Sequence, residues 1–251
     1  FGSQENIQSG KFELIESLPS DGIAVLNRDD ELQVSYKLKN DCKVVWIGID
    51  NKDADVYATN IKLSPNGTDF DCIFKGDKTK YHFETKLLGN NNIYNILASV
   101  ALGRELGMTI EELQTGVRKV NKIEHRLELK QIGNIYMIDD AYNSNPTGAR
   151  MALEVIAAFA TEGSRYVVTP GFVEMGAKQY DNNRLFGCDI AQSKADAVYV
   201  VNEVNRKAIV EGLAEGGYPK DRVHTVASFT EAMAELQPRL KVGDVVLYEN
   251  D

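Results

Sequence analysis

Residues 138–146 read IDDAYNSNP, and they join the end of an apolar run to the start of a helical pattern. The apolar run before them, GNIYMI, is typical of a buried strand, and Asn145 and Pro146 suit the cap and first position of a helix. A strand that turns directly into a helix is the repeating unit of a parallel α/β sheet. The helix that follows is predicted to bury a stripe formed by Ala149, Ala152, Leu153, Ile156 and Ala157.

The same rhythm continues to the end of the chain. From Ile123 onward, strand-like runs alternate with helical patterns near 146–160, 181–195, 203–215 and 229–240. This alternation predicts a mostly parallel, doubly wound sheet. The runs are IYMID, RYVVT, DAVYVVN, RVHTVA and DVVLYE.

The first half of the chain mixes α and β patterns differently. Two buried strands are predicted at 22–27 and 43–49, and a hairpin is predicted around the Pro-Asn-Gly turn of 64–68. Helical spacing follows from Ile93 to Ala101, and Gly107 fits the helix stop. Thr109 and Glu112 form a capping-box pattern that starts another helix. The polar segment 121–124 then separates two predicted domains, 1–122 and 123–251.

The composition narrows the class of protein. The 251 residues carry a formal net charge of −9, which argues against a nucleic-acid partner or an anionic membrane surface. Cys42, Cys72 and Cys188 lie far apart without a zinc or disulfide pattern, as in a cytoplasmic protein with reduced, buried thiols. No apolar run approaches the roughly 20 residues of a membrane span. Because the chain begins with Phe1 and not with Met, we expect a fragment of a longer protein.

Two adjacent aspartates at the end of a predicted strand call for a physical explanation, because two negative charges so close together repel one another. Ligands of doubly wound sheets bind at the carboxyl ends of strands, where Asp139 and Asp140 stand. A carboxylate can accept hydrogen bonds from ribose hydroxyls, while the N–H groups of the helix start face phosphate. The alternative is that the two residues only end a strand and start a helix.

Three other stretches could serve a nucleotide site. The asparagines of 90–92 could read an adenine edge, or Asn90 could simply cap its helix. Arg126 could bind a phosphate with two hydrogen bonds, or it could form an interdomain salt bridge. Lys11 lies in a helical or turn-rich segment, and such a lysine is usually a solvated charge.

Taken in order, GNNNIYN, HRLE and IDDAYNSNP resemble the Mur ligase family of ATP-dependent amide-forming enzymes, and the N-terminal FGSQENIQSGKFE agrees. The resemblance implies that 1–122 is the end of the family's central ATPase domain and that 123–251 is its Rossmann-like C-terminal domain. It also implies a ligase that adds D-alanyl-D-alanine to a UDP-N-acetylmuramoyl-tripeptide through an acyl phosphate, using ATP and Mg2+. The family's phosphate loop, G-x-x-G-K-S/T, is not found, so we expect no ligation by these residues alone.

The resemblance also assigns roles to individual residues. Lys11 matches a lysine that the family often carbamoylates, and a carbamate oxygen could bind Mg2+. Asn92 matches the residue that contacts adenine, and Arg126 matches the arginine that reaches the nucleotide. Asp140 matches the acid that binds the ribose, which leaves Asp139 a structural role. Asn143 and Asn145 follow in the loop near ATP and the incoming amine.

Two segments depart from the family pattern and leave the amine substrate open. PGFVEMG (170–176) lacks the usual acid near Phe172, and VVLYEND ends the chain where a basic, glycine-containing segment is common. Another Mur-type or folylpolyglutamate-type ligase and a non-catalytic Mur-like protein therefore remain alternatives. A Rossmann dehydrogenase is disfavoured because no GxGxxG follows a strand. The expected protein is a monomer that does not insert into membranes.

Overall fold

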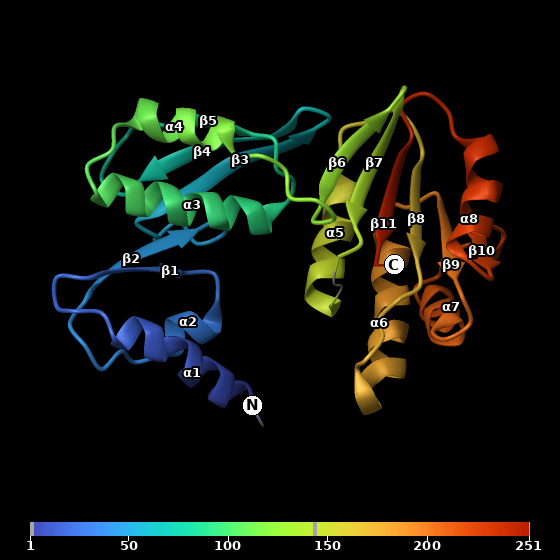
Figure 1. Cartoon of the computed structure of the whole chain (residues 1–251), viewed down its shortest axis with the longest axis horizontal. Coiled ribbons are helices and arrows are strands. Elements are labelled where there is room, and N and C mark those ends of the chain that lie inside the picture. The colour runs from blue at the N-terminus through green and yellow to red at the C-terminus, as the bar shows by residue number, and fades with distance from the viewer. Residues whose placement is uncertain (1–2, 143–144, 251) are drawn as a thin grey trace. The chain divides into compact units, whose positions relative to one another are not determined.

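The computed structural model describes residues 3–142 and 145–250, and the chain divides into two compact units, each with its own sheet (Figure 1). Unit 1 comprises Phe1–Lys62, Asp69–Thr85 and Asn90–Val120. Unit 2 comprises Asn121–Asp251 together with two short segments from earlier in the chain, Leu63–Thr68 and Lys86–Gly89. The predicted domain limits, 1–122 and 123–251, are close to this division but remain a prediction.

The sheet of unit 1 has the strand order β1-β2-β3-β4-β5, and β1 pairs with β2, and β2 with β3, in parallel. The helical spacing predicted between Ile93 and Ala101 is confirmed, since its apolar positions are buried on α3. The capping box of Thr109 and Glu112 is also confirmed. The elements are α1 Gln4–Glu16, β1 Ile23–Asn27, α2 Glu31–Ser35, β2 Lys43–Gly48, β3 Val56–Ser64, β4 Gly67–Phe74, β5 Tyr81–Thr85, α3 Asn90–Glu105 and α4 Ile110–Lys119.

The sheet of unit 2 has the order β10-β9-β8-β11-β7-β6 and is parallel except for the β6–β7 pair. All the strand runs predicted after Ile123 are strands, so the doubly wound sheet is confirmed. The strands are β6 Glu128–Ile132, β7 Ile135–Asp140, β8 Arg165–Thr169, β9 Ala197–Val201, β10 Val223–Val226 and β11 Val245–Glu249. Strand β6 was not predicted, although the Gly133-Asn134 turn that pairs it with β7 is a hairpin signal.

Helices cover both faces of this sheet (Figure 1). Helices α5 (Pro146–Ala158), α6 (Gln179–Gln192) and α7 (Arg206–Glu215) contribute to one core cluster with the sheet, and α8 (Phe229–Leu236) contributes to a second. The first cluster contains Ile138, Leu247 and Val167, whereas the second contains Tyr248 and Val168. Because side chains alternate along a strand, the two clusters mark the two faces of the sheet.

The predicted stripe of α5 is correct at four of its positions and wrong at Ala157, which is only half-buried. Val155 is buried in its place. The stripe is centred on Ala152 and Ile156, and Val155 is covered because it lies against Gly89 of the earlier segment.

The composition predicts reduced, buried cysteines and no membrane span. Cys42, Cys72 and Cys188 are free thiols, as predicted, but only Cys42 and Cys72 are buried. Within 3–142 and 145–250, no helix combines the length and apolar character that a membrane span requires.

Candidate functional site

The predicted site residues fall in both units. Arg126, Asp140 and Asn145 belong to unit 2, at or near the carboxyl end of β7. Lys11 lies exposed on α1, and Asn92 lies half-buried in the first turn of α3, both in unit 1. Asn143 lies outside the described residues.

A row of polar side chains crosses the carboxyl ends of three neighbouring strands in unit 2. Leu247 of β11 is in register with Ile138 of β7 and with Val167 of β8, and all three are fully buried in the core beneath α5, α6 and α7. Two residues further along each strand, on the same face, stand Asp140, Glu249 and Thr169. Glu249 and Asp140 are themselves register partners. The apolar core on this face therefore ends in a polar row.

Hydrogen bonds hold this row in place. The Thr169 hydroxyl donates to Glu249 Oε2 at 2.9 Å and accepts from the backbone N–H of Gly171 at 2.9 Å. The backbone N–H of Leu127 donates to Asp140 Oδ1 at 3.0 Å. The side-chain amide of Asn250 donates to the Gly171 carbonyl at 2.7 Å. These bonds join the segment before β6 to the end of β7, and the segment after β8 to the segment after β11.

The two carboxyl groups of the row, Asp140 and Glu249, both have raised pKa values. Burial raises the pKa of Asp140, while the Leu127 N–H and the positive charge of Arg126 act against this rise. Burial raises the pKa of Glu249 to about 8, although its bond from Thr169 opposes the change. Glu249 is not among the site residues predicted from the sequence. Its signal was an acid that ends the apolar run DVVLYE.

The start of α5 has the geometry predicted for it. Asn145 caps the helix by accepting from the Gly148 N–H at 3.0 Å, and Pro146 occupies the first turn. The first turn contains no acidic residue, so the partial positive charge of this helix end is not offset within the turn. Because α5 covers the face toward which Asp140 points, the Asp140 carboxylate and the N-terminus of α5 lie on the same face of the sheet.

Asp139 points to the opposite face and contacts Lys130 and His125. Lys130 Nζ lies 2.7 Å and His125 Nδ1 lies 2.9 Å from Asp139 Oδ2. Burial favours the protonated acid, but the bonds from Lys130 and His125 outweigh it and lower the pKa of Asp139. These contacts agree with the structural role expected for this residue.

Arg126 lies in a bent segment next to the loop after β7. His125 and Leu127 on either side of it have positive φ angles of 58° and 46°. The Tyr142 N–H donates to the His125 carbonyl at 3.2 Å, and the Arg126 guanidinium lies 4.6 Å from the centre of the Tyr142 ring. Arg126 is exposed, so its donors are accessible to an anionic ligand.

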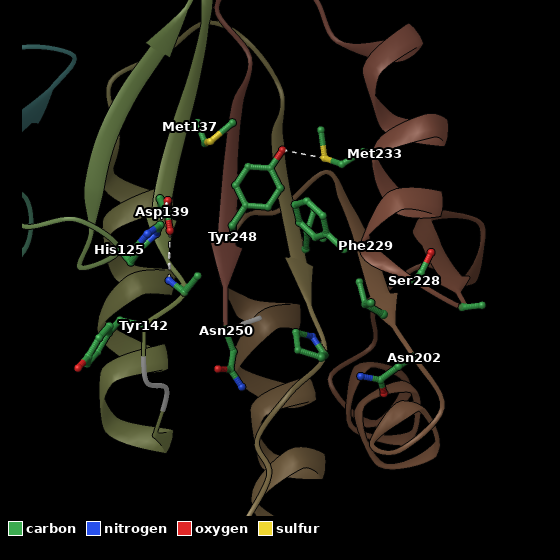
Figure 2. Close-up of a pocket in the computed structure, with 15 residues that line it drawn as sticks. His125, Met137, Asp139, Tyr142, Asn202, Ser228, Phe229, Met233, Tyr248 and Asn250 are labelled. Carbon is green, nitrogen blue, oxygen red and sulfur yellow. Dashed lines mark hydrogen bonds and ion pairs between the residues drawn. The ribbon is translucent and has the colours of Figure 1, made fainter.

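A cavity of about 770 Å³ opens on the Asp139 face of the sheet (Figure 2). Its apolar surface includes Met137, Val168 and Tyr248 of the sheet, with Phe229 and Met233 of α8. Burial raises the pKa of Tyr248 to about 12, so its hydroxyl stays protonated and donates to the sulfur of Met233. This cavity and the Asp140 row therefore lie on different faces of the sheet.

Two groups of described side chains bear on magnesium binding. They are His125, Glu128 and Asp139 in unit 2, and Asp69, His82 and Glu84 in unit 1. The ammonium of Lys130 already lies 3.0 Å from Glu128 and 2.7 Å from Asp139, so a positive charge stands where the first group would hold a cation. Neither group contains Lys11, whose unmodified ammonium cannot bind a cation. Within residues 3–142 and 145–250, neither group forms a complete magnesium site.

Comparison with known proteins identifies both parts of the chain. Residues 1–103 match the model of the Mur ligase middle domain, and residues 125–248 match that of the Mur ligase glutamate ligase domain. The chain is 26% identical, over 99% of its length, to the UDP-N-acetylmuramoyl-tripeptide--D-alanyl-D-alanine ligase of Bacillus subtilis. It is 28% identical, over 98% of its length, to the UDP-N-acetylmuramate--L-alanine ligase of Dictyoglomus turgidum.

The fold agrees with solved structures of the same group. The MurF ligase of Thermotoga maritima in complex with ADP matches all of the chain with a TM-score of 0.81 at 20% sequence identity. At that identity the likeness supports the fold alone. The chain spans about half the length of these proteins: 52% of the Bacillus ligase, 54% of the Dictyoglomus ligase and 55% of the Thermotoga chain.

Proposed function

From the premise that the chain belongs to the Mur ligase family, we propose that it acts in an ATP-dependent ligase that adds D-alanyl-D-alanine to a UDP-N-acetylmuramoyl-tripeptide. The name of the Bacillus relative supports this substrate pair. A UDP-N-acetylmuramate--L-alanine ligase has a comparable identity to the chain, so the comparisons support the family, and the particular step is part of the proposal.

The observation that carries the nucleotide part of the proposal is the placement of Asp140. Asp140 is the last residue of β7, and its carboxylate lies on the face covered by α5, where it accepts a hydrogen bond from the Leu127 N–H. In this position it accepts hydrogen bonds from the ribose hydroxyls of ATP. Arg126, exposed and adjacent in sequence to Leu127, binds a phosphate oxygen, and the first turn of α5, capped by Asn145, favours negative charge.

The proposed reaction has two steps. The γ-phosphoryl group of ATP passes to the tripeptide carboxylate, giving ADP and an acyl phosphate. The amine of D-alanyl-D-alanine then attacks the acyl carbon, loses a proton and displaces phosphate, which leaves an amide. Positioning and charge stabilisation supply most of the rate in such transfers, and Arg126 contributes to both.

The residues of unit 1 have proposed roles as well. The exposed amine of Lys11 is open to carbamoylation, and the carbamate would supply an anionic oxygen to Mg2+, which neutralises phosphate charge when bound. Asn92 is proposed to contact the adenine, and Asn143 is proposed to lie near the nucleotide.

Phosphate release by the intact protein that contains this chain tests the proposal. With ATP, magnesium, the UDP-muramoyl tripeptide and D-alanyl-D-alanine, we expect release that requires both acid and amine. Asp140→Ala should lower kcat/KM by at least tenfold, corresponding to about 1.4 kcal/mol of lost stabilisation. Asp221→Ala, which removes an exposed carboxylate of unit 2, should not.

The alternatives give different outcomes. Release only with another acid and amine would indicate a different Mur-type or folylpolyglutamate-type ligase. An absence of ATP turnover with every pair would indicate a non-catalytic Mur-like protein. Normal turnover by Asp140→Ala would refute the role of Asp140 while leaving the reaction in place.

A further inference from the structure

We propose that Glu249 is a positioning residue of the nucleotide site: it holds the proton of a carboxyl pair with Asp140 and so keeps Asp140 as the charged member. This inference rests on the proposed function, because Asp140 is the group that meets the ribose. It assigns a role to the acid that ends β11, which neither the motifs nor the comparisons single out.

The geometry places the two carboxyl groups as neighbours. Glu249 and Asp140 are register partners on adjacent parallel strands, so their side chains leave the sheet on the same face. Glu249 is fully buried, with 0% of its surface exposed, whereas Asp140 is half-buried. The more enclosed group is therefore the one that a nucleotide reaches less easily.

The surroundings determine which group ionises. The neutral hydroxyl of Thr169 on β8 donates to Glu249, and the negative charge of Asp140 on β7 adds to the rise in the pKa of Glu249. Burial raises the pKa of Asp140 too, and Asp139 adds to this rise, but the Leu127 N–H and the positive charge of Arg126 oppose it. The first turn of α5 adds no acid to this face. Since burial raises the pKa of Glu249 to about 8, the neutral-pH pair carries one negative charge, on Asp140.

A pH dependence follows from this division of charge. Above pH 8, Glu249 ionises and places a second negative charge beside Asp140. Two carboxylates so close together repel one another, and the added negative charge also repels an anionic nucleotide. Nucleotide affinity should therefore fall in alkaline solution because Glu249 ionises.

The first measurement is direct and needs no ligand. The chain labelled with 13C at the glutamate carboxyl carbons is titrated by NMR, and the spectrum of Glu249→Gln identifies the Glu249 resonance. We expect that resonance to titrate near pH 8. Titration near 4.5, the ordinary value for a glutamate, would overturn the proposal.

The second measurement is the affinity for ADP of the intact protein by calorimetry at pH 7 and pH 9. If binding requires the protonated form of a group with a pKa of about 8, affinity falls about tenfold between these two pH values. Phosphate groups, whose last pKa is about 6, do not titrate in this range. In Glu249→Gln, which cannot ionise, the ratio of the two affinities should be near one.

Further variants separate titration of Glu249 from general damage to the fold. Thr169→Val removes the bond that lowers the pKa of Glu249, so the loss of affinity should move to higher pH. Thr169→Ser keeps a hydroxyl and should restore the original midpoint. Glu203→Gln, whose side chain is 86% exposed, should retain the full tenfold loss.

The outcomes distinguish this inference from the proposed function. ADP binding without an alkaline loss, or a loss that persists in Glu249→Gln, would overturn the role of Glu249 alone. An absence of ADP binding at either pH would overturn the nucleotide function, and this inference with it.

Discussion

Gly89 shows what a single residue contributes to this molecule. Its φ is +85°, and a Cβ at this position would lie 3.0 Å from Val155 and 3.1 Å from Leu127. The neighbouring Leu88 is fully buried in the same core. The glycine of the stretch LLGNNNIYN therefore has a packing role in unit 2 that is separate from any ligand role of the asparagines after it.

Replacing Gly89 by alanine should destabilise unit 2. Gly133 has a similar positive φ of +62°, but nothing lies within 4 Å of its Cβ position, which makes it the matched control. Gly133→Ala should cost on the order of 1 kcal/mol through the backbone alone. Gly89→Ala should cost about 1–3 kcal/mol more because its methyl group overpacks the core. Urea unfolding of both variants measures the difference, and equal losses would contradict the packing role.

Glu249 should also make stability depend on pH. Its folded pKa of about 8 lies above its ordinary value of 4.5, so the folded protein holds a proton that the unfolded chain releases. The free energy of unfolding should fall between these two pH values, by an amount on the order of a few kcal/mol. Thermal unfolding at pH 5 and pH 8 tests this, because Glu249→Gln should lose less stability over the interval than the unaltered chain. A parallel decline in both would contradict the assignment.

At the scale of elements, α5 is the helix on which structure and function depend together. Its cap, first turn and buried stripe follow from the sequence of 145–156 and belong to the core of unit 2. The same first turn is proposed to face the nucleotide. Changes at Asn145 should therefore separate the helix-capping role from the ligand role.

Two substitutions at Asn145 make that separation. Asn145→Ala removes the acceptor for the Gly148 N–H and should cost about 1 kcal/mol of stability. Asn145→Asp keeps the cap and should retain stability, yet its added charge should weaken ADP binding severalfold. Thermal unfolding and calorimetric titration of both variants provide the readouts. Unchanged ADP affinity in Asn145→Asp would place the phosphates away from this helix end.

How far these elements follow from the sequence depends on the range of the interactions. The strand, cap and helix of IDDAYNSNP are local patterns, and they were predicted correctly. Strand β6 was missed because ELKQI contains charged residues and lacks the apolar run of a buried strand. It is a short edge strand, and the turn at Gly133-Asn134 brings it into pairing with β7. The meeting of Glu249 with Asp140 could not be predicted, since the register of β11 against β7 is set by core packing between segments far apart in the chain.

At the scale of the whole molecule, two compact units share one chain. Each has its own sheet and buried apolar residues, such as Ile93 in unit 1 and Ile156 in unit 2. The single tryptophan, Trp46, belongs to unit 1, so its fluorescence reports on that unit. We expect the units to unfold as separate cooperative transitions.

Core truncations test this expectation. Ile156→Ala should lower the stability of unit 2 by about 2–5 kcal/mol. It should shift the part of the circular dichroism signal that comes from unit 2, without moving the transition seen by Trp46 fluorescence. Ile93→Ala should move the fluorescence transition instead. If either variant moves both transitions equally, the two units unfold as one.

Unit 2 is discontinuous in the chain, since it includes Leu63–Thr68 and Lys86–Gly89 from within the sequence of unit 1. A genetic crossover near Asn121 would therefore exchange most of this unit but leave Leu88 and Gly89 with the other parent. The new α5 would then pack against a leucine and a glycine selected beside a different helix. Chimaeras between relatives should tolerate a swap of residues 121–251 only when the two short segments travel with it, so the boundary that recombination must respect here is spatial and not linear.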